Sequence, residues 1–134
     1  MLTDEQRTDL IEAALANRSW AYAPYSGYKV GAALLAASGQ IYNGVNVENA
    51  AYPTSICAER AAVFNAVSEG ESKFTAIAVA TSNGGMPCGA CRQVLSEFGL
   101  DILVIVVDQH GKVVTEATVK ELLPGSFGPK DLPR

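Results

Sequence analysis

Apolar residues at helical spacing mark four segments of the chain as helices. Between Leu10 and Leu15 they recur every three or four positions, and this spacing predicts a helix over residues 4–17. Thr3 and Gln6 form the pattern of a capping box at its start. The same criteria, with Gly70 and Gly99 as stop signals, predict further helices over residues 58–67, from Pro87 up to Gly99, and over residues 119–123.

Runs of apolar and β-branched residues predict strands at residues 30–37, 40–47, 74–81, 102–107 and 112–115. Ser38 and Gly39 form a short hairpin turn between the first two. A helix separates strands 74–81 and 102–107, so the three elements make a βαβ unit, whose strands run parallel. The sequence contains no repeat, linker or low-complexity tract, and we expect residues 1–134 to form one α/β domain.

The charge balance limits the classes of partner. Ten Lys and Arg against fourteen Asp and Glu give a net charge of -4 and a pI near 4.9. Binding to a phosphate backbone depends on clustered cations, so we expect a small neutral ligand and no nucleic acid. Charged residues make up 18% of the chain, below the roughly 25% of typical soluble domains, which indicates that other copies of the chain cover part of its surface.

The sequence gives no sign of a membrane segment. The longest purely apolar β-branched run, residues 102–107, is far shorter than the roughly 20 residues that cross a bilayer. The polar N-terminus begins a helix, which is not typical of a signal peptide. Three cysteines cannot all pair within one chain, and we therefore expect reduced thiols and a cytoplasmic protein.

The three cysteines form the pattern of a zinc site. Cys57 precedes one predicted helix, and Cys88 and Cys91 lie at the start of another. Cysteines three apart on a first helical turn share a face, so Cys88 and Cys91 can hold one ion together. Helix N-termini lower the pKa of thiols and favour the thiolates that bind Zn²⁺. Three protein ligands leave a fourth position for water, which is typical of catalytic zinc.

Glu59 follows Cys57 by two residues on the same helical turn. A carboxylate at this place can take a proton from zinc-activated water and return it elsewhere. Direct binding of Glu59 to the metal is the alternative, but a carboxylate is a poor partner for an ion that already has three thiolates. We therefore expect Glu59 to transfer protons.

Two simpler interpretations of the cysteines stay open at this point. Cys88-Gly-Ala-Cys91 in a βαβ unit is also the pattern of a thiol–disulfide redox pair, which leaves Cys57 and Glu59 without a role. The second interpretation is a structural zinc site in which His110 is the fourth ligand. His110 lies in a predicted turn, however, where a solvated histidine is commoner than a ligand.

Together these motifs point to a family. Cys-Ala-Glu followed by Pro-Cys-x-x-Cys is the three-cysteine form of the zinc deaminase signature, and the chain resembles the small bacterial cytidine deaminases along nearly its whole length. The matching segments are residues 22–26, 30–34, 46–52, 57–60, 87–93 and 122–127. The resemblance implies a three-layer α/β/α fold with a mixed central sheet of about five strands.

The resemblance also implies a reaction. Cys57, Cys88 and Cys91 would hold one Zn²⁺ per subunit, and Glu59 would act as general base and then as general acid. Hydroxide would attack C4 of the cytosine ring. Cytidine and 2′-deoxycytidine would become uridine and 2′-deoxyuridine with release of ammonia, as in pyrimidine salvage.

Further matched positions imply contacts with the substrate. Asn46 and Glu48 would hydrogen-bond the ribose hydroxyls, and alternate residues of a strand point the same way, so both can face one ligand. The backbone N–H of Ala58 would meet the pyrimidine oxygen, and Arg60 would donate to the cysteine sulfurs. Tyr28 stands where the family often has a Phe stacked on the base, and its added hydroxyl needs a partner.

The resemblance implies self-association as well, because family members of this length look like homotetramers with shared sites. Tyr52 and Phe127 would then approach a pocket in a neighbouring subunit, although each can instead be an ordinary core residue. Arg92 faces either a subunit contact or the zinc site, and the sequence does not decide between them.

Other functions share parts of this signature. Blasticidin S deaminases have the zinc motif but look different where this chain has Asn46-Val-Glu48-Asn-Ala, so cytidine or 2′-deoxycytidine is the better interpretation than blasticidin S, a related cytosine nucleoside. Enzymes that edit nucleic acids use the same chemistry, but this chain lacks the basic channel that follows a strand. In a non-catalytic zinc-binding domain, Glu59 would be dispensable.

Overall fold

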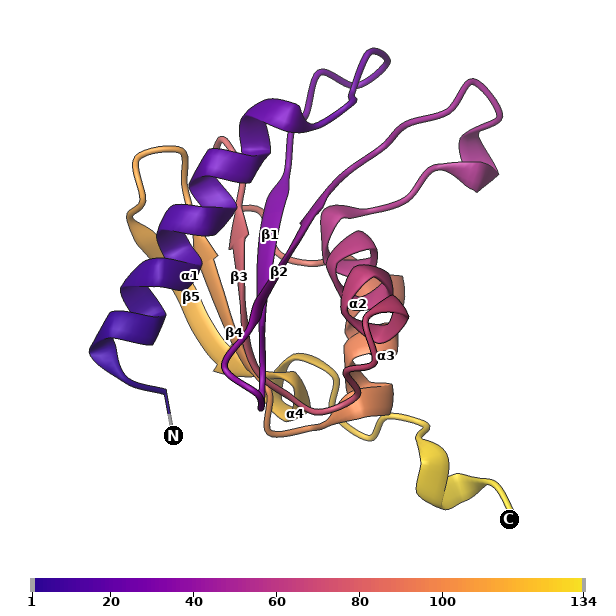
Figure 1. The fold of residues 1–134 in the computed structure, drawn as a ribbon. Helices are drawn as coiled ribbons and strands as arrows, with labels where there is room; N and C mark the ends of the chain where they lie inside the picture. Colours follow the sequence, from indigo (N-terminus) through magenta and orange to yellow (C-terminus); the bar gives the residue numbers. More distant parts are fainter. Residues whose placement is uncertain (1, 134) are drawn as a thin grey trace.

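Helices cover both faces of a five-stranded sheet in the computed structural model, which describes residues 2–133 (Figure 1). In chain order the elements are α1 (Asp4–Asn17), β1 (Gly31–Ala36), β2 (Ile41–Val45), α2 (Ala58–Ser68), β3 (Phe74–Ala80), α3 (Gly89–Phe98), β4 (Leu103–Val107), β5 (Val113–Thr118) and α4 (Val119–Leu122). Single turns of 3-10 helix lie at Arg18–Trp20, Tyr52–Thr54 and Pro129–Asp131. This arrangement confirms the predicted three-layer α/β/α fold.

The sheet has the strand order β2-β1-β3-β4-β5 and is mixed. Strands β3 and β4 pair in parallel, as the βαβ pattern predicts, and the other three pairs are antiparallel. Strand β5 extends to Thr118, three residues beyond its predicted end, because residues 116–118 pair with β4. The prediction of a strand over 40–47 was wrong at its end, since β2 stops at Val45. Residues 46–48 leave the sheet and pair with Tyr22 and Ile56 instead.

Two apolar cores lie on the two faces of the sheet, because alternate residues of each strand point to opposite sides. On one face α1 packs its buried Leu10 and Ala14 against β1, β3 and β4. On the other face α2 and α3 contribute Val63 and Leu95 to a core that includes Leu34 of β1. Strands β1, β3 and β4 are buried along most of their length, which explains their unbroken apolar character, whereas β5 is exposed or half-buried.

Gly44 allows α2 to lie directly on β2. A Cβ atom at Gly44 would collide with the backbone of α2 at Ala58 and Ala62. The close approach of α2, which carries Glu59 and is capped by Cys57, therefore requires a glycine at this position. No helix within residues 2–133 is both long enough and apolar enough to cross a membrane.

Candidate metal centre and active site

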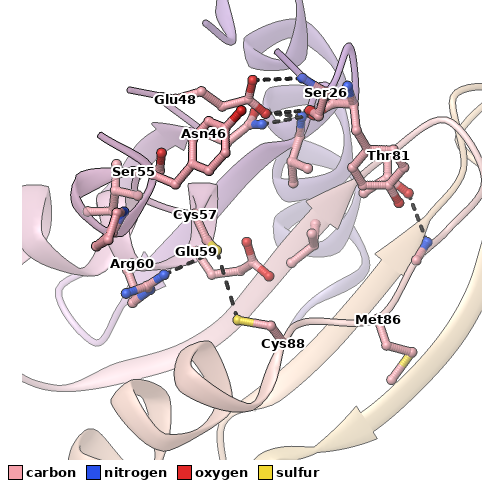
Figure 2. A pocket seen from close by; sticks show the side chains of 17 residues that line it. Ser26, Asn46, Glu48, Ser55, Cys57, Glu59, Arg60, Thr81, Met86 and Cys88 are labelled. Atoms are coloured by element: carbon pink, nitrogen blue, oxygen red, sulfur yellow. Dashed lines mark hydrogen bonds between the residues drawn. The ribbon is translucent and has the colours of Figure 1, made fainter. Parts of the chain in front are cut away.

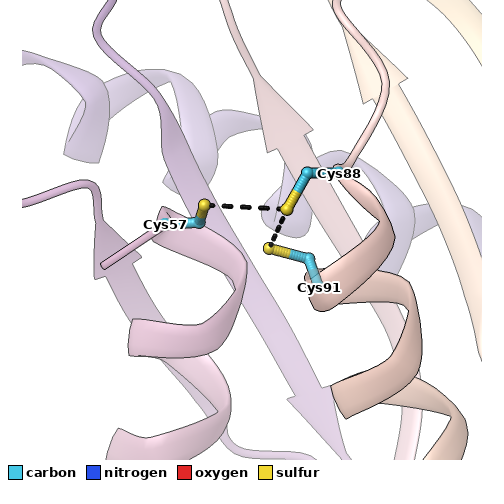
Figure 3. Close-up of side chains that lie close together, drawn as sticks. All are labelled: Cys57, Cys88 and Cys91. Carbon is cyan, nitrogen blue, oxygen red and sulfur yellow. Dashed lines mark hydrogen bonds between the residues drawn. The ribbon is translucent and has the colours of Figure 1, made fainter. Parts of the chain in front are cut away.

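The starts of α2 and α3 bring the three cysteine sulfurs together. Cys57 is the N-cap of α2, Cys88 is the N-cap of α3, and Cys91 lies on the first turn of α3. Cys88 Sγ lies 3.9 Å from Cys57 Sγ and 3.4 Å from Cys91 Sγ, and all three sulfurs lie within 4.8 Å of one another (Figure 3). The cysteines are free thiols rather than a disulfide.

This sulfur cluster fits a zinc ion. A tetrahedral ion with Zn–S bonds of about 2.3 Å has its sulfurs about 3.8 Å apart, which is close to the spacing of the three thiols. Neither Glu59 nor His110 belongs to the group of donor atoms that can share a metal among residues 2–133. The interpretation of a site closed by His110 was therefore wrong, because His110 lies in the turn between β4 and β5.

Arg60 and the neighbouring thiols set the charge of the cluster. The pKa of Cys57 is lowered to about 5, first by its hydrogen bond with the Cys91 thiol and then by the Arg60 guanidinium. Arg60 Nη2 donates to Cys57 Sγ over 3.3 Å. The same bond with Cys57 raises the pKa of Cys91, since Cys91 keeps the proton that it donates to the sulfur anion. The hydrogen bonds with Cys91 and Arg60 thus favour the thiolate form of Cys57.

Glu59 is a buried carboxyl group beside this cluster. Only 5% of its surface is exposed, and it lies on the first turn of α2. Burial raises the pKa of Glu59 to about 7, and the negative charge of Cys57 adds to the increase. A carboxyl group with this pKa exchanges protons readily near neutral pH, which is the property expected of a general acid and base.

A pocket of about 540 Å³ connects Glu59 and the sulfurs with a second polar group (Figure 2). Cys57, Cys88 and Glu59 line one end, and Asn46 and Glu48 line the other. The pocket is therefore large enough for a small molecule and polar at both ends.

Asn46 and Glu48 are both held by backbone groups of the segment before β1. Asn46 Oδ1 accepts from Val30 N–H over 2.9 Å, and Asn46 Nδ2 donates to the Tyr28 carbonyl over 2.8 Å. Glu48 Oε1 accepts from the backbone N–H groups of Tyr25 and Ser26 at 2.9 and 3.0 Å. Each side chain keeps unused hydrogen-bonding capacity, namely one amide N–H of Asn46 and the remaining lone pairs of Glu48.

Ser26 completes this polar end, and sequence reasoning did not single it out. Its hydroxyl donates to Glu48 Oε2, and this bond, with the backbone N–H of Ser26, lowers the pKa of Glu48. The Tyr-Ser-Gly turn was visible in the sequence, but Glu48, the partner of the Ser26 hydroxyl, is 22 residues away. Thr81, Gly85 and Met86 of the loop after β3 also line the pocket, and no pattern in the sequence indicated them.

The structure separates the remaining predicted substrate residues. Tyr28 lines the pocket, and so does Tyr52, which is 72% exposed at its rim and contacts the Tyr25 ring edge-on. Ala58 is buried in the core at the first position of α2 and does not line the pocket. Phe127 belongs to the segment after α4, which projects from the sheet, and it does not reach this pocket within one chain (Figure 1).

Arg92 braces the backbone that carries Cys88. Its Nε donates to the Pro87 carbonyl and its Nη1 to the Leu122 carbonyl, both over 2.8 Å. Arg92 therefore links the start of α3 to the end of α4 within one chain. These two contacts stabilise the loop next to the sulfur cluster.

Comparisons with known proteins agree with this chemistry. Residues 4–108 match the model of the cytidine and deoxycytidylate deaminase zinc-binding region. The chain is 47% identical to a cytidine deaminase of Sporosarcina psychrophila over 92% of each chain, and 46% identical to one of Halalkalibacterium halodurans over 94% of this chain and 97% of the relative.

Solved structures show the same relationship. The fold superposes on the crystal structure of cytidine deaminase from Burkholderia pseudomallei with a TM-score of 0.85 and 46% identity, over 90% of this chain and 98% of that one. The cytidine deaminase of Mycobacterium tuberculosis gives a TM-score of 0.82 at 37% identity, over 94% and 98% of the two chains. The match of the family model and these close relatives show that the chain belongs to the cytidine and deoxycytidylate deaminase family.

Proposed function

We propose that the chain hydrolytically deaminates free cytidine and 2′-deoxycytidine to the corresponding uracil nucleosides and ammonia, with one Zn²⁺ per subunit. One observation carries the proposal: the buried carboxyl group of Glu59, whose pKa is raised to about 7, lines the same pocket as Cys57 and Cys88. The names of the relatives support cytidine as the substrate.

Cys57, Cys88 and Cys91 would hold the zinc ion, because their sulfurs have the spacing and softness that zinc requires. When bound, zinc supplies activation of a water molecule for nucleophilic attack at neutral pH. Arg60 donates to Cys57 Sγ and offsets part of the negative charge that three thiolates place around the site.

Glu59 would move the protons of the reaction. Its carboxylate accepts a proton from the attacking water and delivers it to N3 of cytosine, which makes C4 more electrophilic. After the oxygen has added to C4, Glu59 assists transfer of a proton to the amino nitrogen, and the C4–N bond breaks to release ammonia. A carboxyl group with a pKa near 7 serves both directions of transfer.

The polar end of the pocket would bind the sugar. The spare amide N–H of Asn46 can donate to a ribose hydroxyl, and Glu48, kept ionised by Ser26, can accept from one. The net charge of -4 favours an uncharged nucleoside over a phosphorylated one. We therefore propose nucleosides, rather than nucleotides or nucleic acids, as the substrate class.

Self-association and location complete the proposal. Trp20, Tyr52 and Phe127 are 81%, 72% and 57% exposed, and large apolar groups at these exposures are consistent with contacts between copies of the chain. We propose a homotetramer in which Tyr52 and Phe127 approach the pocket of a neighbouring subunit. Residues 1–134 would act as one domain, and the reduced thiols fit the cytoplasm.

A substrate panel tests the proposed function. Purified protein with measured zinc content is assayed for ammonia release from cytidine, 2′-deoxycytidine, cytidine monophosphate, blasticidin S and adenosine. We expect turnover of the first two, loss of turnover after zinc is removed with a chelator, and recovery when zinc is restored. Fully zinc-loaded protein that leaves both nucleosides intact would refute the proposal, and turnover of blasticidin S alone would change the substrate.

A further inference from the structure

We infer that the Tyr28 hydroxyl positions residues 81–86 as one wall of the pocket and thereby limits the size of the base that the pocket accepts. Tyr28 belongs to the segment before β1, and residues 81–86 form the loop after β3. The two segments meet across the pocket although they are far apart in the sequence. The inference concerns a positioning role and rests on the proposed deamination of nucleosides.

Asn83 is the partner of the Tyr28 hydroxyl. Tyr28 Oη donates to Asn83 Oδ1 over 2.8 Å. On the loop side, the Thr81 hydroxyl also points at Asn83 Oδ1, at 3.5 Å, and Thr81 Oγ1 accepts from the backbone N–H of Gly85 over 2.9 Å. A continuous set of contacts therefore runs from Tyr28 through Asn83 and Thr81 to the backbone of Gly85.

Gly85 shows that the loop is fitted around the hydroxyl. A Cβ atom built on Gly85 would collide with Tyr28 Oη, whereas its next neighbours, Asn83 Oδ1 at 3.5 Å and Tyr28 Cζ at 3.6 Å, are at ordinary contact distance. The backbone of Gly85 does not have a positive φ, so an alanine there meets no strain of its own. Of the three atoms nearest to that Cβ position, the Tyr28 hydroxyl is thus the one that excludes a side chain at Gly85.

These contacts bear on the pocket because its lining includes Tyr28, Thr81, Gly85 and Met86. Because the Tyr28 hydroxyl donates to Asn83, its polar group has a partner within the protein. Removal of the hydroxyl releases the loop from Tyr28 and leaves Asn83 Oδ1 with a single weak contact. The wall that carries Met86 is then free to move outward, and the pocket widens.

A double-mutant cycle of Tyr28→Phe and Gly85→Ala tests the contact. We expect Y28F to raise KM for cytidine about three- to tenfold with little change in kcat, the effect of one lost hydrogen bond. We expect G85A to raise KM about tenfold in the wild-type background, because it forces the hydroxyl away, but less than about twofold in the Y28F background. Additive effects of the two substitutions would overturn the inference.

The size of the accepted base is measured separately. The ratio of kcat/KM for cytidine to that for the bulkier 5-methylcytidine should fall in Y28F and in Asn83→Ala. The control is Tyr42→Phe, which removes a hydroxyl that donates to Glu71 outside the pocket, and it should leave KM and the ratio unchanged. An unchanged ratio in both Y28F and N83A would overturn the role in size selection.

The melting temperature keeps the contact testable apart from catalysis. G85A should lower Tm in the wild-type background more than in Y28F, because the collision exists in the first background alone. If zinc-loaded wild-type protein turns over no cytidine, the proposed function fails, but the coupling in Tm still decides whether Tyr28 holds the loop. Equal changes of Tm in both backgrounds would overturn the inference.

Discussion

Arg60 follows Cys57 by one turn of α2, and its Nη2 lies 3.3 Å from Cys57 Sγ. The guanidinium is half-buried, and its Nε has no hydrogen-bond partner within residues 2–133, so the charge of Arg60 is directed mainly at the sulfurs. The thiolates in turn raise the pKa of Arg60, which keeps it protonated. A permanent cation therefore adjoins the site where three sulfur anions would hold zinc.

Removal of this cation should weaken zinc binding most at low pH. The pKa of Cys57 is lowered by Cys91 and then by Arg60, so Arg60→Gln raises it and lets protons compete with zinc at a higher pH. We expect weaker zinc affinity in a competitive chelator titration, and an acid limb of activity that begins at a higher pH. Arg7→Gln, which removes the same charge from α1, is the control. An unchanged affinity and pH profile would contradict this role.

Asn46→Ala should lower both substrate affinity and stability. The substitution leaves the partly buried Val30 N–H and Tyr28 carbonyl without their partner, and an unpaired group costs up to about 1–3 kcal/mol when it is fully buried. Urea denaturation should show a loss of about 1–3 kcal/mol, and KM for cytidine should rise. Asn65→Ala, which removes an exposed side-chain bond to Asn43, should change stability far less. Equal stability losses in the two variants would show that the Asn46 bonds carry no special weight.

Gly44→Ala should destabilise the protein through the contact between β2 and α2. The new methyl group collides with the α2 backbone at Ala58 and Ala62, and such overpacking costs about 1–3 kcal/mol or more. Because α2 carries Cys57 and Glu59, zinc content should fall in the same variant. Gly128→Ala, where a Cβ meets no atom within 4 Å, is the matched control and should have the unfolding free energy of wild type.

Burial of Glu59 should make the stability of the metal-free protein depend on pH. Its pKa is raised from 4.5 to about 7, so the folded state binds more protons than the unfolded state between these values. The free energy of unfolding contributed by Glu59 therefore falls as pH rises from 4.5 to 7, by about 3 kcal/mol in total.

The comparison of wild type with Glu59→Gln isolates this contribution from that of Cys57, whose lowered pKa acts in the opposite direction. Chemical denaturation at several pH values should show that E59Q gains stability relative to wild type as pH rises through this window. A constant difference between the two proteins would mean that the pKa of Glu59 is not raised in the folded state.

Local chemistry explains which parts of the fold the sequence predicted. Helix α1 begins and ends where expected, and its start is set by the capping box of Thr3 and Gln6, which are neighbours in the chain. The boundaries of β2 and β5 depend on pairing with distant segments, and the prediction missed both. The same distinction holds in the site, where the spacing of Cys88 and Cys91 is local and predicted their shared role.

Long-range contacts account for what the sequence could not indicate. The partners of Tyr28 and Glu48 lie 55 and 22 residues away, so Asn83 and Ser26 gave no signal of their own. The resemblance to a family placed Tyr28 in the pocket but could not name the partner of its hydroxyl. Phe127 is the opposite case, since a single chain does not bring it to the pocket and its implied contact requires a second subunit.

Turnover by zinc-loaded Glu59→Gln tests the central claim most directly. The substitution keeps the size of the side chain and removes its ability to accept a proton. We predict one zinc per chain, as in wild type, and a kcat for cytidine lower by about 10²-fold or more. Glu12→Gln, an exposed position on α1, should retain full activity. Near-normal turnover by E59Q with a full complement of zinc would contradict the assignment of Glu59 as the group that transfers protons.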